Sequence, residues 1–134
     1  MNANADGLDM LMFKVFVLFV MIFAHIVDDY YLQGILAKMK QKSWWKENSP
    51  DELYKRDYIV ALLMHAFSWS FMINLPTLLV SRNYILMCIF MVINTYIHAC
   101  VDNEKANKHS INLVIDQTFH LIQIVNLWLC VVVF

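Results

Sequence analysis

The amino-acid sequence predicts an all-α membrane protein, a bundle of four transmembrane helices with a short interfacial helix between the first and the second. Hydrophobic residues make up 60% of the 134 residues and charged residues only 16%, a balance typical of helices in a bilayer. At this length the chain has room for one domain, expected to cover 1–134. Four apolar stretches are each close to the roughly 20 residues that span a membrane, and they run over about 8–27, 58–80, 84–101 and 111–134.

The first apolar stretch is expected to remain in the protein as its first membrane helix. Asp6 and Asp9 stand where a secretory signal would carry positive charge, and no small-residue cleavage site follows the stretch. Polar residues continue at helical spacing up to Gln33, so this helix is expected to extend beyond the bilayer.

The second and third stretches carry signals of their own. Pro76 predicts a kink near the end of the second. The third is apolar all round apart from Asn94, Thr95 and His98, which suits lipid better than a soluble amphipathic helix. A soluble four-helix bundle is the alternative fold.

The segment between the first two stretches predicts contact with the membrane surface. Trp44 and Trp45, beside several lysines, are typical of an interfacial aromatic belt. Ser49 as a cap, Pro50 at the first position and Glu52 at the third predict the start of a short helix there.

Basic residues predict the orientation of the bundle. Eight of them lie in the first and third loops and only two, Lys14 and Arg82, on the opposite side. The positive-inside rule therefore places both termini outside and the loops 34–57 and 102–110 in the cytoplasm. The eight are Lys38, Lys40, Lys42, Lys46, Lys55, Arg56, Lys105 and Lys108.

Net charge and cysteine content exclude other classes of protein. A formal net charge of −1 gives no global attraction to nucleic acid, so no nucleic-acid partner is expected. Cys88, Cys100 and Cys130 lie in apolar stretches without CxxC spacing, and they are interpreted as reduced packing residues.

Histidine and aspartate residues recur on the apolar stretches at one spacing. Three stretches carry a His/Asp pair four residues apart, which puts both side chains on one helix face, and the fourth carries a lone histidine. Ionisable groups in membrane helices are costly and usually mark a functional site. The pairs are His25/Asp29, His98/Asp102 and Asp116/His120, and the lone residue is His65.

The predicted topology brings these residues to one depth, in the cytoplasmic half of the membrane. The first and third stretches each end with their pair at the cytoplasmic side. His65 lies eight residues beyond Asp57, roughly 12 Å along its helix. Asp116 and His120 lie six and ten residues beyond Ser110, roughly 9 and 15 Å along theirs. The topology was assigned from basic residues alone, so this agreement is independent support.

Imidazole and carboxylate groups together predict a divalent metal, with zinc favoured over manganese or iron. Seven candidates suit two ions better than a single four-coordinate ion, although some carboxylates could instead orient a histidine. Asp28 lies about 100° around the helix from Asp29, so it is interpreted as a solvated charge at the helix end or as a proton acceptor. The predicted ligands are His25, Asp29, His65, His98, Asp102, Asp116 and His120.

These residues carry a resemblance to a family of small bacterial and phage inner-membrane proteins of uncharacterised function. The pattern covers nearly the whole chain: H-x3-D-[aromatic]-x-L-Q, then a lone helical His, then H-x3-D-x2-K, then D-Q-x2-H. The resemblance implies a bacterial inner-membrane location, and the plan is similar to that of membrane-bound metal-dependent hydrolases. The matching residues are His25, Asp29, Tyr30, Leu32, Gln33, His65, His98, Asp102, Lys105, Asp116, Gln117 and His120.

The functional prediction is metal-dependent hydrolysis of an amphiphilic or lipid-linked phosphoester or diphosphate at the cytoplasmic face. Asp28 or Asp102 would accept a proton, and Lys105, Gln33 and Gln117 would hold the substrate's negative charge. The lipid bilayer is the expected partner, together with an anionic lipid or lipid-linked substrate, and a homo-oligomer is left open.

Two other functions remain as alternatives. One is a non-catalytic, metal-stabilised membrane interaction module, for example a phage factor directed at the host. The other is an ion or proton transporter, which needs polar groups up to the outer face. On the fourth stretch such groups become sparse beyond Gln123 and Asn126.

Overall fold

The computed structural model describes residues 3–134, and these residues form helices and no β-strand. The predicted all-α fold is confirmed. Residues 1–2 of the expected 1–134 domain lie outside this description. Four helices, with the turns that extend them, are long and apolar enough to cross a membrane. Their α-helical parts are α1 (Ala3–Ile26), α4 (Asp57–Asn74), α5 (Tyr84–Asn103) and α6 (Leu113–Trp128).

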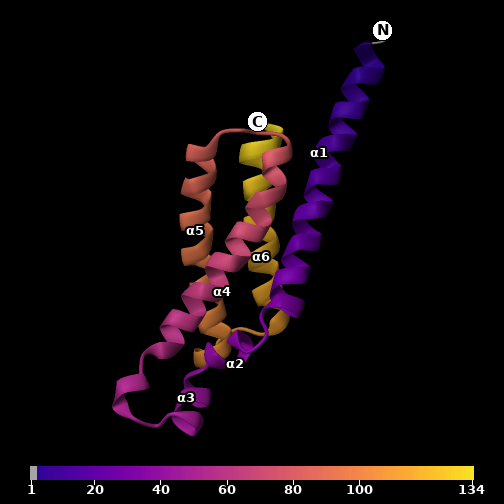
Figure 1. Cartoon of the computed structure of the whole chain (residues 1–134). Coiled ribbons are helices and arrows are strands. Elements are labelled where there is room, and N and C mark those ends of the chain that lie inside the picture. The colour runs from indigo at the N-terminus through magenta and orange to yellow at the C-terminus, as the bar shows by residue number, and fades with distance from the viewer. Residues whose placement is uncertain (1–2) are drawn as a thin grey trace.

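The two termini lie at the same end of the bundle, and the short helices α2 (Leu36–Met39) and α3 (Lys42–Asn48) lie at the other end (Figure 1). α4 packs most extensively against α5. The N-terminal half of α1 leans away from the other helices, and its apolar side chains Leu8, Leu11 and Met12 are 54–59% exposed. Its C-terminal half packs on α4 and α6.

Wider or tighter helical turns extend all four long helices. π-helical turns follow α1 at η1 (Val27–Leu32) and α5 at η4 (Glu104–Lys108), so the first helix continues past residue 27, where its apolar stretch was expected to end. Its extension beyond the bilayer stays a prediction. After α4 the helix tightens into the 3₁₀ segment η3 (Leu75–Leu79), with Pro76 near its start. The helix therefore changes type at the proline where a kink was predicted.

The short helix expected between the first two long helices begins earlier than the sequence suggested. Ser49 ends α3 instead of starting a helix, because its N–H bonds to the Trp45 carbonyl and its backbone leaves the helical region. The following Pro50 disfavours a helical conformation at Ser49. Asp51 is the actual cap, accepting a 2.9 Å bond from the Leu53 N–H at the short 3₁₀ helix η2 (Glu52–Tyr54). The prediction of Ser49 as the cap was wrong.

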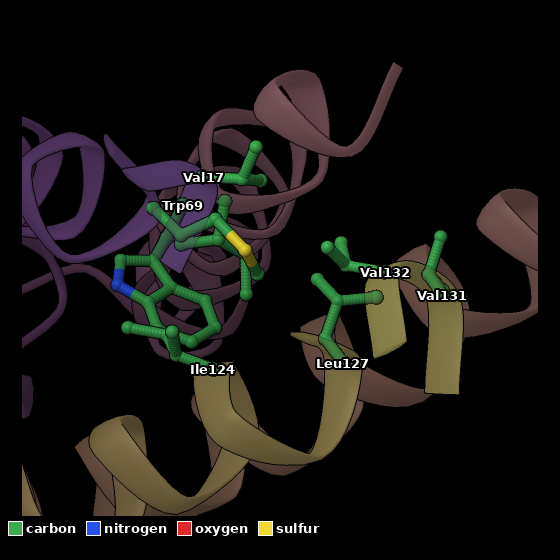
Figure 2. Close-up of a cluster of buried hydrophobic side chains, with 8 residues drawn as sticks. Val17, Trp69, Ile124, Leu127, Val131 and Val132 are labelled. Carbon is green, nitrogen blue, oxygen red and sulfur yellow. The ribbon is translucent and has the colours of Figure 1, made fainter. Parts of the chain in front are cut away.

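An apolar core fills the end of the bundle nearer the termini (Figure 2). Trp69 lies at its edge, and its indole nitrogen points away from the other labelled side chains. The indole is fully buried, so it separates the apolar core from the polar residues at the α2 end. The cluster contains Val17, Met21, Trp69, Ile73, Ile124, Leu127, Val131 and Val132.

Two hydrogen bonds fasten α1 to the end of α6. The Trp128 indole donates to the Lys14 carbonyl at 2.8 Å, and the Lys14 ammonium donates to the Val133 carbonyl at 3.1 Å, in the π turn η5 (Leu129–Val133). Trp128→Phe is expected to lower the free energy of unfolding by about 1 kcal/mol, because it removes the hydrogen bond from the indole to the Lys14 carbonyl. Unfolding in mixed detergent micelles measures the loss. The matched control is Trp44→Phe, whose indole N–H donates to no described group; an equal loss there would contradict the assignment.

Candidate metal centre

Four imidazole rings, one from each long helix, meet at the α2 end of the bundle, as the sequence predicts. None of them is more than 2% exposed. The rings of His98 and His120 stack at 4.1 Å between centroids, and the His65 ring meets His98 edge-on at 5.0 Å. His25 lies 5.8 Å from His120. The predicted convergence of the four helices on one polar centre is therefore observed.

The first group of candidate ligands is Asp29, His65 and His98, which offer ligand atoms within 4.8 Å of one another. His65 Nε2 lies 3.1 Å from His98 Nε2 and 3.3 Å from Asp29 Oδ1. Ligand atoms about 2.0–2.1 Å from a tetrahedral ion are roughly 3.3–3.4 Å apart. The observed spacing is thus close to that of ligands around one zinc-sized ion.

A second group, His98, Asp102 and His120, also has ligand atoms within 4.8 Å, and Asp102 connects it to the first. Asp102 Oδ2 lies 3.4 Å from His65 Nε2, whereas its Oδ1 lies 3.6 Å from His120 Nε2. Asp116 Oδ1 approaches the same His120 nitrogen at 3.5 Å and accepts no hydrogen bond. One carboxylate therefore faces both groups, with one oxygen toward each.

The π turn η1 brings both neighbouring aspartates inward. Asp28 is 1% exposed and Asp29 is 9% exposed, so the interpretation of Asp28 as a solvated charge was wrong. A π-helix bonds i to i+5 and packs more residues into each turn than an α-helix, so adjacent side chains diverge less. Asp28 accepts a 2.6 Å bond from the Ser68 hydroxyl, and its other oxygen lies 3.8 Å from His65 Nδ1.

His25 is held by two neighbours at both ring nitrogens. The Trp69 indole donates to Nδ1 at 2.7 Å, and because an indole can only donate, that nitrogen carries no proton. Nε2 then donates to Gln117 Oε1 at 3.0 Å. The Gln117 amide nitrogen donates in turn to Asp29 Oδ2 at 2.9 Å and to Asp116 Oδ2 at 3.0 Å. In this arrangement neither nitrogen of His25 is free for a metal.

Two lysines neutralise carboxylates of the centre. Lys40, the residue that ends α2, contacts Asp102 Oδ2 at 2.6 Å. Lys105, in η4, contacts Asp116 Oδ2 at 2.6 Å. The Lys105 side chain is 36% exposed, so it also reaches solvent. The Lys40 ammonium group occupies Asp102 Oδ2, an oxygen atom that a metal ion would compete for, whereas Lys105 leaves Asp116 Oδ1 free.

A cavity of about 360 Å³, here called the polar pocket, opens onto the centre from the α2 side. Its lining includes Asp29, Gln33, Lys40, Asp102 and Lys105. The Gln33 amide bonds Asp29 Oδ1 at 2.8 Å. The two lysines and the amide make this pocket suitable for an anionic group, and they place such a group beside the candidate ligands.

Two residues of the centre were missed from the sequence. Trp69 was given no role in the sequence analysis, but it donates to His25 and stacks on the His98 ring at 4.3 Å. Its spacing of four residues from His65 was the available signal, because it places both on one face. Lys40 was interpreted as a topology lysine, and nothing in the sequence indicates which loop lysine reaches Asp102.

A layer of uncharged polar side chains continues from the imidazoles toward the termini. Ser70, Asn74 and Thr77, on α4 and η3, are each at most 1% exposed, and Gln123 donates to the Asn94 side chain at 3.1 Å. The polar character therefore extends further along α4 than it does on α6. Among the described residues, side-chain atoms of this layer without a hydrogen-bond partner are Ser70 Oγ, Asn74 Oδ1, Asn94 Nδ2, Thr95 Oγ1 and Gln123 Oε1.

Comparison with known proteins assigns the chain to a family but indicates no activity. Residues 17–134 match the family model described as "Protein of unknown function (DUF3307)". The chain belongs to the DUF3307 family. No curated protein and no solved structure matches it. The DUF3307 match contains every candidate ligand from His25 to His120, and it agrees with the predicted resemblance to an uncharacterised family. The likeness to metal-dependent hydrolases stays a prediction.

Proposed function

We propose that this DUF3307 protein binds two divalent metal ions within its helix bundle and hydrolyses a lipid-linked phosphoester or diphosphate there. The observation that carries the proposal is the position of Asp102. Its carboxylate lies between two groups of imidazoles and directs one oxygen at each. A carboxylate that bridges two ions about 3.5–4 Å apart is a common feature of two-metal hydrolytic sites.

The ligand distances suggest a division between the two ions. Asp29 Oδ1, His65 Nε2, His98 Nε2 and Asp102 Oδ2 would hold the first ion. Asp102 Oδ1, Asp116 Oδ1 and His120 Nε2 would hold the second, which leaves positions open for water or substrate. The mixture of imidazole and carboxylate suits zinc first, with manganese and iron as alternatives.

The charge balance of the centre favours cations. Four carboxylates are buried there, and two lysine ammonium groups contact them, which leaves two negative charges. Burying an uncompensated carboxylate costs several kcal/mol, so a centre without further positive charge would be strained. Two divalent ions would reverse the balance and favour an anionic ligand. The four carboxylates are Asp28, Asp29, Asp102 and Asp116.

In the proposed reaction, the metal ions would activate a bound water and polarise the phosphoryl oxygen. The protein residues would position the ligands and the substrate. Asp28, beside His65 Nδ1, would orient this imidazole so that Nε2 faces the metal, which suits it better than the role of proton acceptor. Lys40 and Lys105, once displaced from their carboxylates, would hold the phosphate in the polar pocket together with Gln33.

The first test is the metal content of the chain, purified without a metal-binding tag, for the wild type and His98→Ala. About two equivalents of zinc, manganese or iron per chain are expected for the wild type. The variant should lose at least one of them. His109→Ala is the matched control: this histidine lines the polar pocket but belongs to neither group of candidate ligands, so its loss should leave the content unchanged. Absence of metal in the wild type after reconstitution would overturn the proposal.

A second test separates a hydrolase from a non-catalytic metal module. Release of inorganic phosphate from phosphatidic acid and from an isoprenyl diphosphate is measured in detergent, with and without a chelator. Hydrolysis that is lost with the metal would support the enzyme. Two tightly bound ions without hydrolysis of either substrate would favour the interaction module.

The uncharged polar layer favours one further candidate function, ion or proton transport. Five buried polar atoms without partners are suited to a chain of internal waters between the metal centre and the terminal end of the bundle. This candidate predicts proton flux into protein-containing vesicles, reduced by Asn94→Leu. Flux equal to that of protein-free vesicles would exclude it.

Gln117 was predicted to bind substrate, but its amide is engaged by three protein groups, and we assign it a positioning role. Gln117→Leu is expected to weaken metal affinity about 10–100-fold, because His25, Asp29 and Asp116 lose the group that orients them. Titration against a competing chelator measures the change. Gln123→Leu, the same change farther along α6, should leave the affinity within about twofold. Equal effects from the two variants would contradict this role.

A further inference from the structure

A second cavity, here called the lateral groove, lies between α1 with its η1 extension and α6, and has a volume of about 520 Å³. Most of its lining is apolar or aromatic, from Ile22, Ile26, Tyr30, Tyr31 and Leu121. Ile26 and Leu121 are each 41% exposed. Both helices are apolar enough to cross a membrane, so in a bilayer this groove would open sideways to lipid.

The innermost residues of the lateral groove are His25 and Gln117, the polar pair that adjoins the metal centre. Gln117 also bonds both Asp29 and Asp116, so this amide connects the groove to the candidate ligands. Tyr30 lines both the lateral groove and the polar pocket. The two cavities are therefore neighbours that reach the same centre, one from the lipid side and one from the α2 side.

The lining of one cavity is polar and charged and that of the other is apolar, like the head group and the hydrocarbon chain of a lipid. The polar pocket offers Lys40 and Lys105 to an anion, whereas the lining of the lateral groove contains no Asp, Glu, Lys or Arg, and its His25 is hydrogen-bonded at both ring nitrogens. Tyrosines such as Tyr30 and Tyr31 favour the level where head groups meet hydrocarbon. A ligand that reached from one cavity to the other would need an anionic head and an apolar chain.

We propose that the lateral groove binds the hydrocarbon chain of an anionic phospholipid whose head group occupies the polar pocket. This inference rests on the proposed function in one respect: the bound lipid is taken to belong to the substrate class of the hydrolase. The groove itself is independent of metal. A soluble phosphate ester, which has no chain, would leave it unused.

The test uses vesicles that contain phosphatidic acid with a photoreactive diazirine on its acyl chain. After irradiation, labelled peptides are mapped by mass spectrometry. We expect more label on 22–31 and around Leu121 than on the lipid-facing surfaces of α4 and α5. Phosphatidylcholine with the same chain serves as the neutral probe, and Lys105→Met should reduce labelling by the anionic probe only.

Two substitutions with matched exposure test the groove itself. Leu121→Trp would fill it and is expected to reduce labelling by about tenfold, whereas Ile122→Trp, on the neighbouring residue at 49% exposure, should not. Ile26→Trp gives a second filled groove in case the first variant is poorly folded. Equal labelling in the filled and control variants, or label spread evenly over all four helices, would overturn the proposal.

Metal content measured on the same samples separates the two proposals. Groove labelling in a protein without metal would leave the lipid site standing and remove the hydrolase. Two bound ions with uniform labelling would leave the metal centre standing and overturn the lipid site.

Discussion

Asp102→Asn is expected to reduce metal content from about two equivalents per chain to less than about 0.2. The substitution keeps the size of the side chain but removes the charge that faces both ligand groups, 3.4 Å from His65 and 3.6 Å from His120. A neutral amide is a weak metal ligand, and only its oxygen atom can coordinate an ion. Metal analysis measures the loss, and phosphate release should fall by about a thousandfold, the equivalent of roughly 4 kcal/mol of transition-state stabilisation.

Asp28→Asn is the matched comparison, because Asp28 is a buried carboxylate that lies beside Nδ1, the other ring nitrogen of His65. A residue that only orients a ligand should change affinity and leave stoichiometry intact. We expect about 10–100-fold weaker binding, with two ions recovered at saturating metal. If Asp102→Asn retains both ions, Asp102 is no bridge, and the two-metal arrangement is wrong.

The helices and the convergence of the polar residues were predictable because both follow from regular geometry. His98 and Asp102 lie four residues apart, and such a pair shares a face on any α-helix. Charge asymmetry between loops then predicted one depth for the pairs. The imidazoles of His65 and His120 do meet His98, and His25 lies beside His120. Neither step depends on how the helices pack.

The features of the site that were not predicted from the sequence arise where the structure departs from this regular geometry. Asp28 is buried only because the chain forms a π turn at η1, and a spacing of about 100° per residue does not apply there. His25 loses both ring nitrogens to Trp69 and Gln117, a consequence of packing between three helices. Lys40 reaches the centre because the chain reverses at Gly34, whose φ is +50°.

Lys40→Met is expected to destabilise the metal-free protein by about 3–5 kcal/mol, because it leaves the buried Asp102 carboxylate without its cation. The pair is well shielded: the Lys40 side chain is 12% exposed and the Asp102 side chain 3%. Metal should restore most of this loss, since an ion at Asp102 replaces the missing ammonium group. The same variant should bind metal more tightly than the wild type, because Lys40 no longer competes for Asp102 Oδ2. Unfolding measured with and without metal, and a chelator titration, test both expectations.

This substitution separates a metal centre from a polar core held together by salt bridges. In a salt-bridged core, Lys40→Met would be destabilising whether or not metal is present, since no ion takes the place of the lysine. In a metal centre, the loss is confined to the metal-free state. Lys38→Met, an exposed lysine on the same short helix α2, is the control and should change stability by less than about 0.5 kcal/mol. Equal destabilisation with and without metal would mean that the positive charge at Asp102 is supplied by Lys40 alone.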